Sequence, residues 1–239
     1  MLELRDIHWS LPTGEELING INLKIEPGKL TVVTGPNGGG KTTLAKLIAG
    51  LNVPTSGQIL FNGEDITASS ITDRAKLGIS YAFQQPVKFK GLTVANLLNI
   101  AAGEKLPMNR ACDLLSKVGL CANEYINRPI DSHLSGGESK RIEIATVLAR
   151  KSSVLVFDEP EAGIDLWSFT SLIETFKSLK DEQDGALLVI SHQERILEIA
   201  DEIVVIANGK IRVSGKADDI MPQLMTGEYT KSCHAIDKE

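Results

Sequence analysis

A run of glycines near the start of the chain ends in a lysine and a threonine, in the spacing GxxxxGK[ST]. Such glycines let successive backbone N–H groups turn toward one anion without a Cβ clash. The lysine of this pattern reaches the β- and γ-phosphates of a nucleotide, and the hydroxyl that follows it is placed to ligate Mg²⁺. The residues of the run are Gly35, Pro36, Asn37, Gly38, Gly39, Gly40, Lys41 and Thr42.

The residues on both sides of this loop have the patterns that a phosphate site needs. Leu30–Thr34 is an apolar, β-branched run that predicts a buried strand, and Thr43–Ala49 has helical spacing. A strand, a glycine loop and a helix N-terminus together form a concave anion site. We therefore count Thr43 among the predicted phosphate-binding residues. A flexible glycine loop that happens to hold a lysine is the alternative interpretation.

Four further polar residues directly follow predicted strands. Asp158 and Glu159 follow one strand, His192 follows the next, and Gln84 follows an earlier one. Ligands of open α/β sheets bind outside the carboxyl ends of the strands, so these side chains are expected to converge on the glycine loop. Taken alone, Asp158 and Glu159 could simply cap a helix, and His192 could simply satisfy backbone groups.

Each of these side chains suits one task in nucleotide hydrolysis. Asp158 ends an apolar run, where an unpaired carboxylate is costly, so a magnesium ion is its natural partner. Glu159 suits a general base for the attacking water, and His192 a contact to the γ-phosphate. The Gln84 amide is expected at Mg²⁺ or at the water. The predicted catalytic residues are Glu159, His192, Gln84 and Lys41, and the predicted metal ligands are Thr42, Gln84 and Asp158.

The rest of the chain predicts an α/β fold. Residues 1–34 alternate short apolar strands with turns, which suggests an antiparallel set, and the stretch from about 92 to 128 has helical periodicity. A βα rhythm then implies a parallel sheet covered on both faces. Asn208-Gly209 is a strong signal for a type I′ hairpin turn. The later elements are predicted at 154–157, 166–180, 186–190, 193–200, 203–206 and 210–213.

Bulk composition narrows the class of protein. At 239 residues, with 42% hydrophobic and 23% charged residues, the chain suits one large globular domain. A net charge of −6 offers no overall basic surface for nucleic acid. No stretch is apolar enough for a membrane span, and the charged N-terminus lacks a signal-peptide core, which favours a cytoplasmic protein.

The three cysteines have no metal-site spacing, which disfavours disulfides and zinc. Cys112 and Cys121 are interpreted as partly buried small hydrophobes. Cys233, beside His234, lies in a polar tail that begins at Thr226 and is expected to be poorly ordered.

A second glycine motif completes a set of motifs that occur in a recognisable order. The motifs are, in order, the glycine loop, Gln84, Leu134-Ser135-Gly136-Gly137-Glu138, Asp158-Glu159, Ala162-Gly163-Ile164-Asp165 and His192. Together they make the chain similar to the ATPase domain of the ABC superfamily over nearly its whole length. The resemblance implies a P-loop NTPase core with a mostly parallel sheet, an N-terminal antiparallel β subdomain and a helical subdomain.

The resemblance also implies an organisation of the chain. Residues 1–90 and 150–225 would form the catalytic core with the β subdomain. Residues from about 91 to 149 would form the helical subdomain with the second motif, and 226–239 a polar tail. All would belong to a single domain covering 1–239.

The resemblance further implies how ATP and the second motif meet. The Ser135 hydroxyl and the backbone N–H groups at a helix start form a second anion site. In the family this site caps the γ-phosphate bound by the other subunit, so a transient head-to-tail dimer would enclose two ATP molecules with Mg²⁺. Asp165 would lie near that interface. The second-motif residues predicted to contact nucleotide are Ser135, Gly136, Gly137 and Glu138.

The adenine contact departs from the family pattern. Family members often stack the base on an aromatic residue of an early strand, and that position falls at Leu11. Trp9, one strand repeat earlier on the same face, is the candidate instead. Core packing is an equally good interpretation of Trp9.

The partner is the finer question. Three local stretches resemble the SufC type of ATPase, which implies a SufB/SufD-type scaffold for iron-sulfur cluster assembly. Pro160-Glu161 departs from the serine-rich stretch common in SufC. The alternative is the motor subunit of a membrane transporter, with transmembrane permease partners. The three stretches are Phe83-Gln84-Gln85-Pro86-Val87, the run from Glu138 to Ile144, and His192-Gln193-Glu194-Arg195-Ile196-Leu197.

Overall fold

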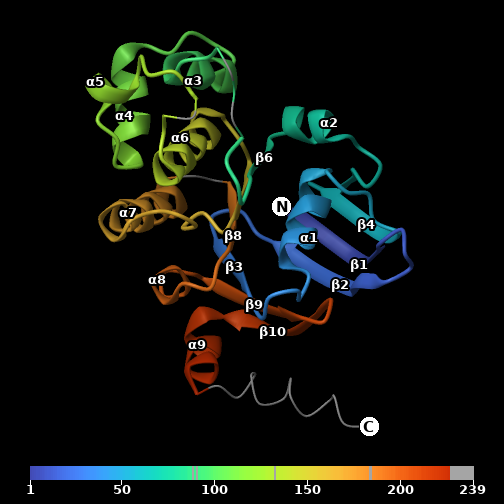
Figure 1. Ribbon diagram of the computed structural model, residues 1–239. Helices are drawn as coiled ribbons and strands as arrows, with labels where there is room; N and C mark the ends of the chain where they lie inside the picture. Colours follow the sequence, from blue (N-terminus) through green and yellow to red (C-terminus); the bar gives the residue numbers. More distant parts are fainter. Residues whose placement is uncertain (88, 90, 132, 183–184, 227–239) are drawn as a thin grey trace.

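The computed structural model describes residues 1–87, 89, 91–131, 133–182 and 185–226. Two sheets and the helices around them make up this part of the chain (Figure 1). The strands are β1 (Leu2–Ser10), β2 (Glu16–Ile25), β3 (Leu30–Thr34), β4 (Ser56–Phe61), β5 (Glu64–Asp65), β6 (Ile79–Ala82), β7 (Val154–Asp158), β8 (Ala186–Ile190), β9 (Glu202–Ala207) and β10 (Lys210–Lys216). The helices are α1 (Lys41–Ala49), α2 (Ile71–Lys76), α3 (Val94–Ala102), α4 (Met108–Lys117), α5 (Ala122–Tyr125), α6 (Gly136–Ala149), α7 (Leu166–Glu182), α8 (Glu194–Leu197) and α9 (Ala217–Met225).

The larger sheet has the strand order β10-β9-β3-β8-β7-β6. Strands β9, β3, β8, β7 and β6 run parallel, and β10 pairs antiparallel with β9. The chain order of these strands differs from their spatial order, so β6 and β7 are neighbours although α3–α6 separate them in sequence. The predicted mostly parallel sheet is confirmed, and its carboxyl edge gathers the ends of β3, β6, β7 and β8.

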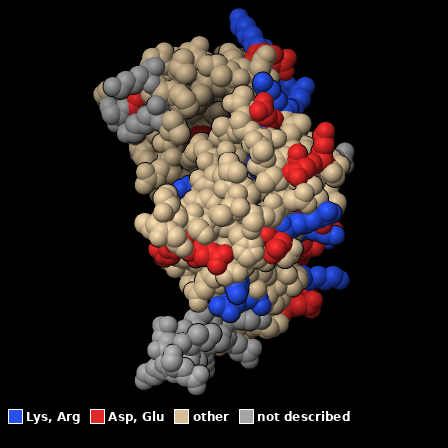
Figure 2. All heavy atoms as spheres, turned by 90° about the vertical axis from the view of Figure 1, so that its right-hand side faces the viewer, with Lys and Arg blue, Asp and Glu red and all other residues tan. Residues whose placement is uncertain are grey.

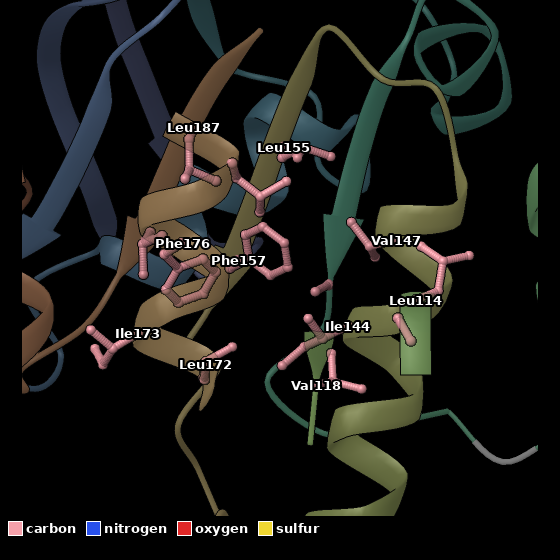
Figure 3. Close-up of a cluster of buried hydrophobic side chains, with 14 of the residues drawn as sticks. Leu114, Val118, Ile144, Val147, Leu155, Phe157, Leu172, Ile173, Phe176 and Leu187 are labelled. Atoms are coloured by element: carbon pink, nitrogen blue, oxygen red, sulfur yellow. The ribbon is translucent and has the colours of Figure 1, made fainter. Parts of the chain in front are cut away.

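Both faces of this sheet are buried, because alternate residues of each strand enter different cores. Leu155 and Phe157 of β7 pack with the helices on one side, whereas Val154 and Val156 pack on the opposite side. Figure 3 shows the helical side, where side chains of α4, α6 and α7 meet those of β7 and β8. Phe157 packs edge-on against Phe176 of α7, with ring centroids 5.2 Å apart. This packing holds α6 and α7 on the face of the larger sheet to which Leu155 and Phe157 point.

The smaller sheet has the order β2-β1-β4-β5 and is antiparallel throughout. Its buried face packs with α1 and with the second face of the larger sheet. A fully buried arginine on α2, Arg74, secures the end of α1 by donating to the carbonyl oxygens of Leu47 at 2.6 Å and Ile48 at 2.9 Å. These bonds hold the C-terminal end of the helix that follows the glycine loop. The predicted N-terminal antiparallel subdomain is confirmed.

Several local predictions can be compared with the observed elements. The apolar runs Leu2-Glu3-Leu4 and Ile7–Leu11 predict two short strands, but one strand, β1, covers Leu2–Ser10. It has a register shift between Leu4 and Ile7 and a positive φ of 47° at Asp6. A bulge of this kind bends a strand without ending it. The helix expected over 193–200 is shorter, because α8 covers Glu194–Leu197. Asn208 and Gly209 have φ of 51° and 70°, which confirms the type I′ turn.

The prediction that Cys112 and Cys121 are partly buried is right for the first and wrong for the second. Cys112 is partly buried against the helical core, as predicted, but Cys121 is exposed. Cys121 precedes the short helix α5 as its N-cap, where the neighbouring Ala122 takes the buried position. Cys233 and the tail predicted after Thr226 lie outside the described residues. Within those residues, none of the helices combines the length and the apolarity that a bilayer span requires.

Candidate active site

The glycine loop lies at the carboxyl end of β3 and runs into the N-terminus of α1. Glycine is required at Gly35, where φ is 130° and a Cβ would lie 2.0 Å from the carbonyl oxygen of Ile206. The N-cap of α1 is Gly40, which supplies no side chain, and the first turn of this fully described helix holds no acid. Its backbone N–H groups are therefore available to an anion, with the helix dipole favouring negative charge. Pro36, Asn37 and Gly38 form the exposed crest of the loop.

Lys41 lies folded onto the loop that precedes it. Its ammonium donates to the carbonyl oxygens of Gly35 at 2.9 Å and Pro36 at 2.8 Å, and the residue is 6% exposed. Burial lowers the pKa of Lys41, and the nearby carboxylates of Glu159 and Asp158 oppose that shift. A buried ammonium beside a concave anion site is the arrangement that phosphate binding requires.

Asp158 ends β7 beneath the glycine loop and is fully buried. One carboxylate oxygen accepts from the Thr42 hydroxyl at 3.2 Å, and the other accepts from the Tyr81 hydroxyl at 2.9 Å. Burial raises the pKa of Asp158, and the two hydrogen bonds oppose that shift. The structure thus brings together two of the predicted metal ligands, Thr42 and Asp158.

These ligands have the oxygen chemistry that Mg²⁺ prefers. The described residues contain no cluster of three or more His, Cys, Asp or Glu side chains that could hold a metal by itself. Mg²⁺ usually keeps several ligands from water and substrate phosphate, so a site of one hydroxyl and one carboxylate beside a phosphate loop fits it. Gln84, the third predicted ligand, directs its amide nitrogen to Glu159 instead.

Glu159 is the meeting point of the predicted catalytic residues. Its Oε2 accepts from the Gln84 amide at 2.6 Å, and its Oε1 lies 3.8 Å from Nε2 of His192. Its backbone has φ of 45°, which is uncommon for a residue other than glycine. Such conformations cluster at functional sites. Residues far apart in sequence therefore converge on one carboxylate.

We expect the imidazole of His192 to titrate below its ordinary value of 6.5, because burial disfavours its charged form and Lys41 adds like-charge repulsion. Folding then favours the neutral ring, and this contribution to stability is present above pH 6.5 and lost as pH falls through the folded-state pKa. Histidine NMR titration measures it, with His192→Gln assigning the signal. Lys41→Ala is expected to shift the midpoint upward.

His8 is the internal reference for that titration, because a hydrogen bond from its ring to Glu16 raises its pKa. The two histidines should therefore depart from the ordinary value in opposite directions. A midpoint for His192 at or above that of His8 would contradict the electrostatic description of the site.

The second glycine motif forms the N-terminus of α6. The Ser135 hydroxyl accepts from the Glu138 N–H at 3.2 Å, and the Glu138 carboxylate accepts from the Ser135 N–H at 2.7 Å, which makes a capping box. Hydrogen bonds from Tyr125 and Ser135 lower the pKa of Glu138 to about 2. Gly136 and Gly137 occupy the first turn. Among the described residues no hydrogen bond joins this segment to the glycine loop of the same chain.

Asp165 begins α7 on the same side as this helix N-terminus. Its carboxylate accepts from the N–H groups of Trp167 and Ser168, which caps α7. Gly137 lies close to the loop that precedes Asp165, since a Cβ at Gly137 would come 2.7 Å from the carbonyl oxygen of Gly163. The second motif and the Asp165 loop therefore form one surface.

The remaining predicted contact residues lie near the loop or in the antiparallel sheet. Thr43 occupies the first turn of α1 and is partly buried. Trp9 pairs with Ile18 across β1 and β2 and packs, partly buried, against the core of the antiparallel sheet. Its observed contacts match the core-packing interpretation, and base stacking by Trp9 stays a prediction.

Several residues that contact the site have no motif in sequence. Tyr81 reaches Asp158 because β6 and β7 are adjacent strands, and this adjacency depends on the sheet order. Glu161, two residues after Glu159, accepts from the Ser191 hydroxyl at 2.5 Å, and burial raises the pKa of Glu161. This bond ties the loop after β7 to the loop that carries His192. In the sequence, the one indication that Tyr81 and Glu161 contact the site is that each lies near the end of a predicted strand.

A glycine loop between a central strand and a helix, beside a buried aspartate at the end of a neighbouring strand, defines a P-loop nucleotide-binding protein. A family model described as "ABC transporter" matches residues 18–162. The chain belongs to this family, and it is an ATP-binding ABC ATPase.

Relatives and solved structures agree with that assignment. An uncharacterized ABC transporter ATP-binding protein of Methanocaldococcus jannaschii is 36% identical, over 98% of this chain and 94% of its own length. A sulfate/thiosulfate import ATP-binding protein, CysA, of Synechocystis is 38% identical, over 85% of this chain and 57% of its own. A dimeric ATP-binding cassette in a post-hydrolysis state with ADP and Pi has a TM-score of 0.81 and 24% identity, covering 91% of this chain and 99% of its own. At that identity the structural match shows the shared fold.

Proposed function

We propose that this ATPase is the motor subunit of an ABC membrane transporter, driven by ATP hydrolysis in a dimer of two such chains. The single observation that carries the proposal is an apolar groove lined by Tyr81 and Phe83. A groove of this kind gives a partner access to the segment that leads into Gln84. The printed names of the relatives, which are transporter ATP-binding proteins, favour a transporter as the partner.

The proposed active site is completed between two copies. In the described part of the chain no hydrogen bond joins the glycine loop to the Ser135–Glu138 segment, and a solved cassette of the same fold is dimeric. The segment's helix N-terminus and its adjoining Asp165 loop form the surface that would face the second copy's nucleotide. In this proposal each copy is a single domain, in which residues 1–90 and 150–225 form the catalytic core and residues from about 91 to 149 form the helical part.

Hydrolysis would proceed by in-line attack of water on the γ-phosphorus. The water oxygen forms the new P–O bond, the bond from phosphorus to the β–γ bridging oxygen breaks, and Glu159 accepts the proton that the water loses. Gln84 and His192 would orient the water and the γ-phosphate around that carboxylate, and Lys41 would neutralise phosphate charge. Mg²⁺, when bound at Thr42 and Asp158, supplies further neutralisation of the phosphate oxygens.

The groove lies between α6 and α3 on one side and α1 and α2 on the other. Figure 2 shows a hollow on this face, bordered largely by uncharged side chains. Val87 and Phe89 on its rim are 47% and 40% exposed, an unusual cost for apolar side chains without a partner. Tyr81 and Phe83 line its wall, so a segment inserted there would touch the neighbours of Asp158 and Gln84.

The SufC-like assignment is the second candidate. It rests on the three local stretches of sequence, and the names of the relatives do not support it. Two residues of those stretches, Lys140 and Glu143, have local roles around Phe83 and thus need no scaffold to explain them. The nature of the partner separates the two candidates.

Purification of the tagged full chain from its native cells is the test, with the partners identified by mass spectrometry. We expect co-purification with a membrane protein of several spans, and we expect Ala101→Arg to abolish it because the new charge enters the groove wall. Ile100→Arg, on the exposed face of the same helix, is the matched control.

A soluble scaffold that is lost in Ala101→Arg would replace the transporter assignment with the SufC-like one. A partner that binds both variants equally well would contradict the groove as the docking site. ATP binding, measured in parallel, should be the same in both variants because α3 does not contact the glycine loop.

A further inference from the structure

The backbone at Phe83 is held by two side chains of α6, the helix whose N-terminus carries the second glycine motif. The Phe83 N–H donates to Oε1 of Glu143 at 2.9 Å, and the Phe83 carbonyl oxygen accepts from the Lys140 ammonium. The same ammonium lies 3.4 Å from the carbonyl oxygen of Gln84. A helix side chain therefore replaces the strand partner that this backbone lacks beyond the end of β6 at Ala82.

This arrangement, which we call the Lys140–Glu143 clamp, is buried and internally neutral. The residue Lys140 is 0% exposed, and its ammonium lies 3.2 Å from Oε2 of Glu143, whose side chain is 13% exposed. Burying a lysine is costly unless its charge is paired and its donors are satisfied. Glu143, on the same helix, pairs the charge, whereas the other donors of the ammonium are satisfied only while the Phe83–Gln84 backbone stays in place. The clamp and the segment therefore order each other.

The ordered backbone positions the side chain of Gln84. Its side chain is exposed, yet its amide nitrogen lies 2.6 Å from Oε2 of Glu159. An exposed side chain at the start of an irregular segment reaches a defined acceptor only if its backbone is fixed. The clamp fixes that backbone from the carbonyl of Gln84 itself and from both polar groups of the preceding residue.

We propose that Lys140 and Glu143 are positioning residues for ATP hydrolysis, which hold the Phe83–Gln84 backbone so that the Gln84 amide lies on Glu159. The proposal rests on the role assigned above to Gln84. It links α6, whose first turn is expected to face the second copy's nucleotide, to the water site of its own chain. A rotation of α6 would then withdraw Gln84 from Glu159.

A competing route runs through Asp158, because the charge of Lys140 also lowers the pKa of that buried carboxyl. A double-mutant cycle separates the two routes. Lys140→Met is made in the wild-type chain and in Gln84→Ala, and kcat and KM for ATP are measured with the full chain. If the clamp acts through Gln84, Lys140→Met lowers kcat about 10-fold or more in the wild-type chain, since small misplacements of positioned groups cost up to about 100-fold. In Gln84→Ala it should change kcat less than about 2-fold, with KM little changed in both.

Equal losses from Lys140→Met in both backgrounds would overturn the clamp, and so would a loss confined to KM. If Gln84→Ala alone leaves kcat unchanged, the assigned role of Gln84 fails and the inference falls with it. If each single variant lowers kcat and the two losses are not additive, the result supports both the role of Gln84 and the clamp. Failure of the clamp and failure of the role of Gln84 are therefore distinguishable.

A second pair of variants covers the case in which Lys140→Met does not fold. Glu143→Gln keeps an acceptor for the Phe83 N–H, whereas Glu143→Leu removes it. We expect Gln to retain most of the kcat that Leu loses, which a purely steric role of this side chain would not produce. Lys151→Met, at an exposed position just beyond α6, is the matched control for loss of a lysine charge.

Discussion

Glu159→Gln is expected to lower kcat for ATP hydrolysis about 1,000-fold, since a positioned general base contributes roughly 100- to 10,000-fold. Glutamine keeps the size of the side chain and an oxygen that can accept from the Gln84 amide, but it cannot take a proton from water. ATP affinity should persist, because the glycine loop and Lys41 are untouched. Steady-state ATPase assays and equilibrium nucleotide binding measure the two quantities separately.

Glu198→Gln is the matched control, because Glu198 is an exposed glutamate at the end of α8, away from the carboxyl edge of the sheet. Its kcat should equal that of the wild-type chain. Turnover that survives Glu159→Gln at more than a tenth of the wild-type rate would refute the assignment of Glu159 as base. The bound-nucleotide dimer should also accumulate in Glu159→Gln if hydrolysis is what loosens it, which size-exclusion chromatography with ATP measures.

Lys41→Ala is expected to weaken ATP binding at least about 100-fold, which corresponds to roughly 2.7 kcal/mol and lies in the range for a charge-assisted hydrogen bond. Lys41 is buried, with 6% of the residue exposed, and its ammonium already lies at two loop carbonyls, so it needs little reorganisation to turn toward phosphate. Isothermal titration with ATP measures the affinity. Because the loss occurs in binding, it appears even when hydrolysis is blocked.

Lys46→Ala tests whether that loss depends on position. Lys46 lies on the same helix, in its last turn, five residues after Lys41. Its replacement should leave ATP affinity within about 2-fold of the wild-type value, because charge effects on a helix end fall off within one turn. Equal affinities of Lys41→Ala and wild type would remove the phosphate contact from the description of the site.

Much of the fold follows from residues that are close in sequence. Continuous apolar runs mark β7 and β8, the glycine loop marks the junction of β3 and α1, and Asn208-Gly209 marks the β9–β10 turn. These signals are local because backbone sterics and hydrophobic periodicity act over a few residues. The same locality explains the errors: a bulge near Asp6 joined two predicted strands, and α8 ends early at Leu197.

The chemistry of the site could also be predicted from the types of its residues. A phosphate loop with Lys41 and Thr42, followed by Asp158 and Glu159 after an apolar strand, predicts nucleotide chemistry whatever the exact sheet order. The partner was less readable, because the stretches that resemble SufC include residues such as Lys140 whose observed contacts lie inside this chain. A residue whose contacts lie inside its own chain can thus resemble a signature of partner binding.

By itself, then, the sequence determined that this protein binds nucleotide through a P-loop, and it identified the residues that could hydrolyse it. Only the tertiary structure decided that Gln84 and His192 flank Glu159, that Tyr81 holds Asp158, and that α6 fixes the Phe83–Gln84 backbone. The physical reason is the order of strands in the sheet. The adjacency of β6 and β7 and the packing of α6 against β6 arise from burial of side chains shared by distant segments, and no local pattern specifies them.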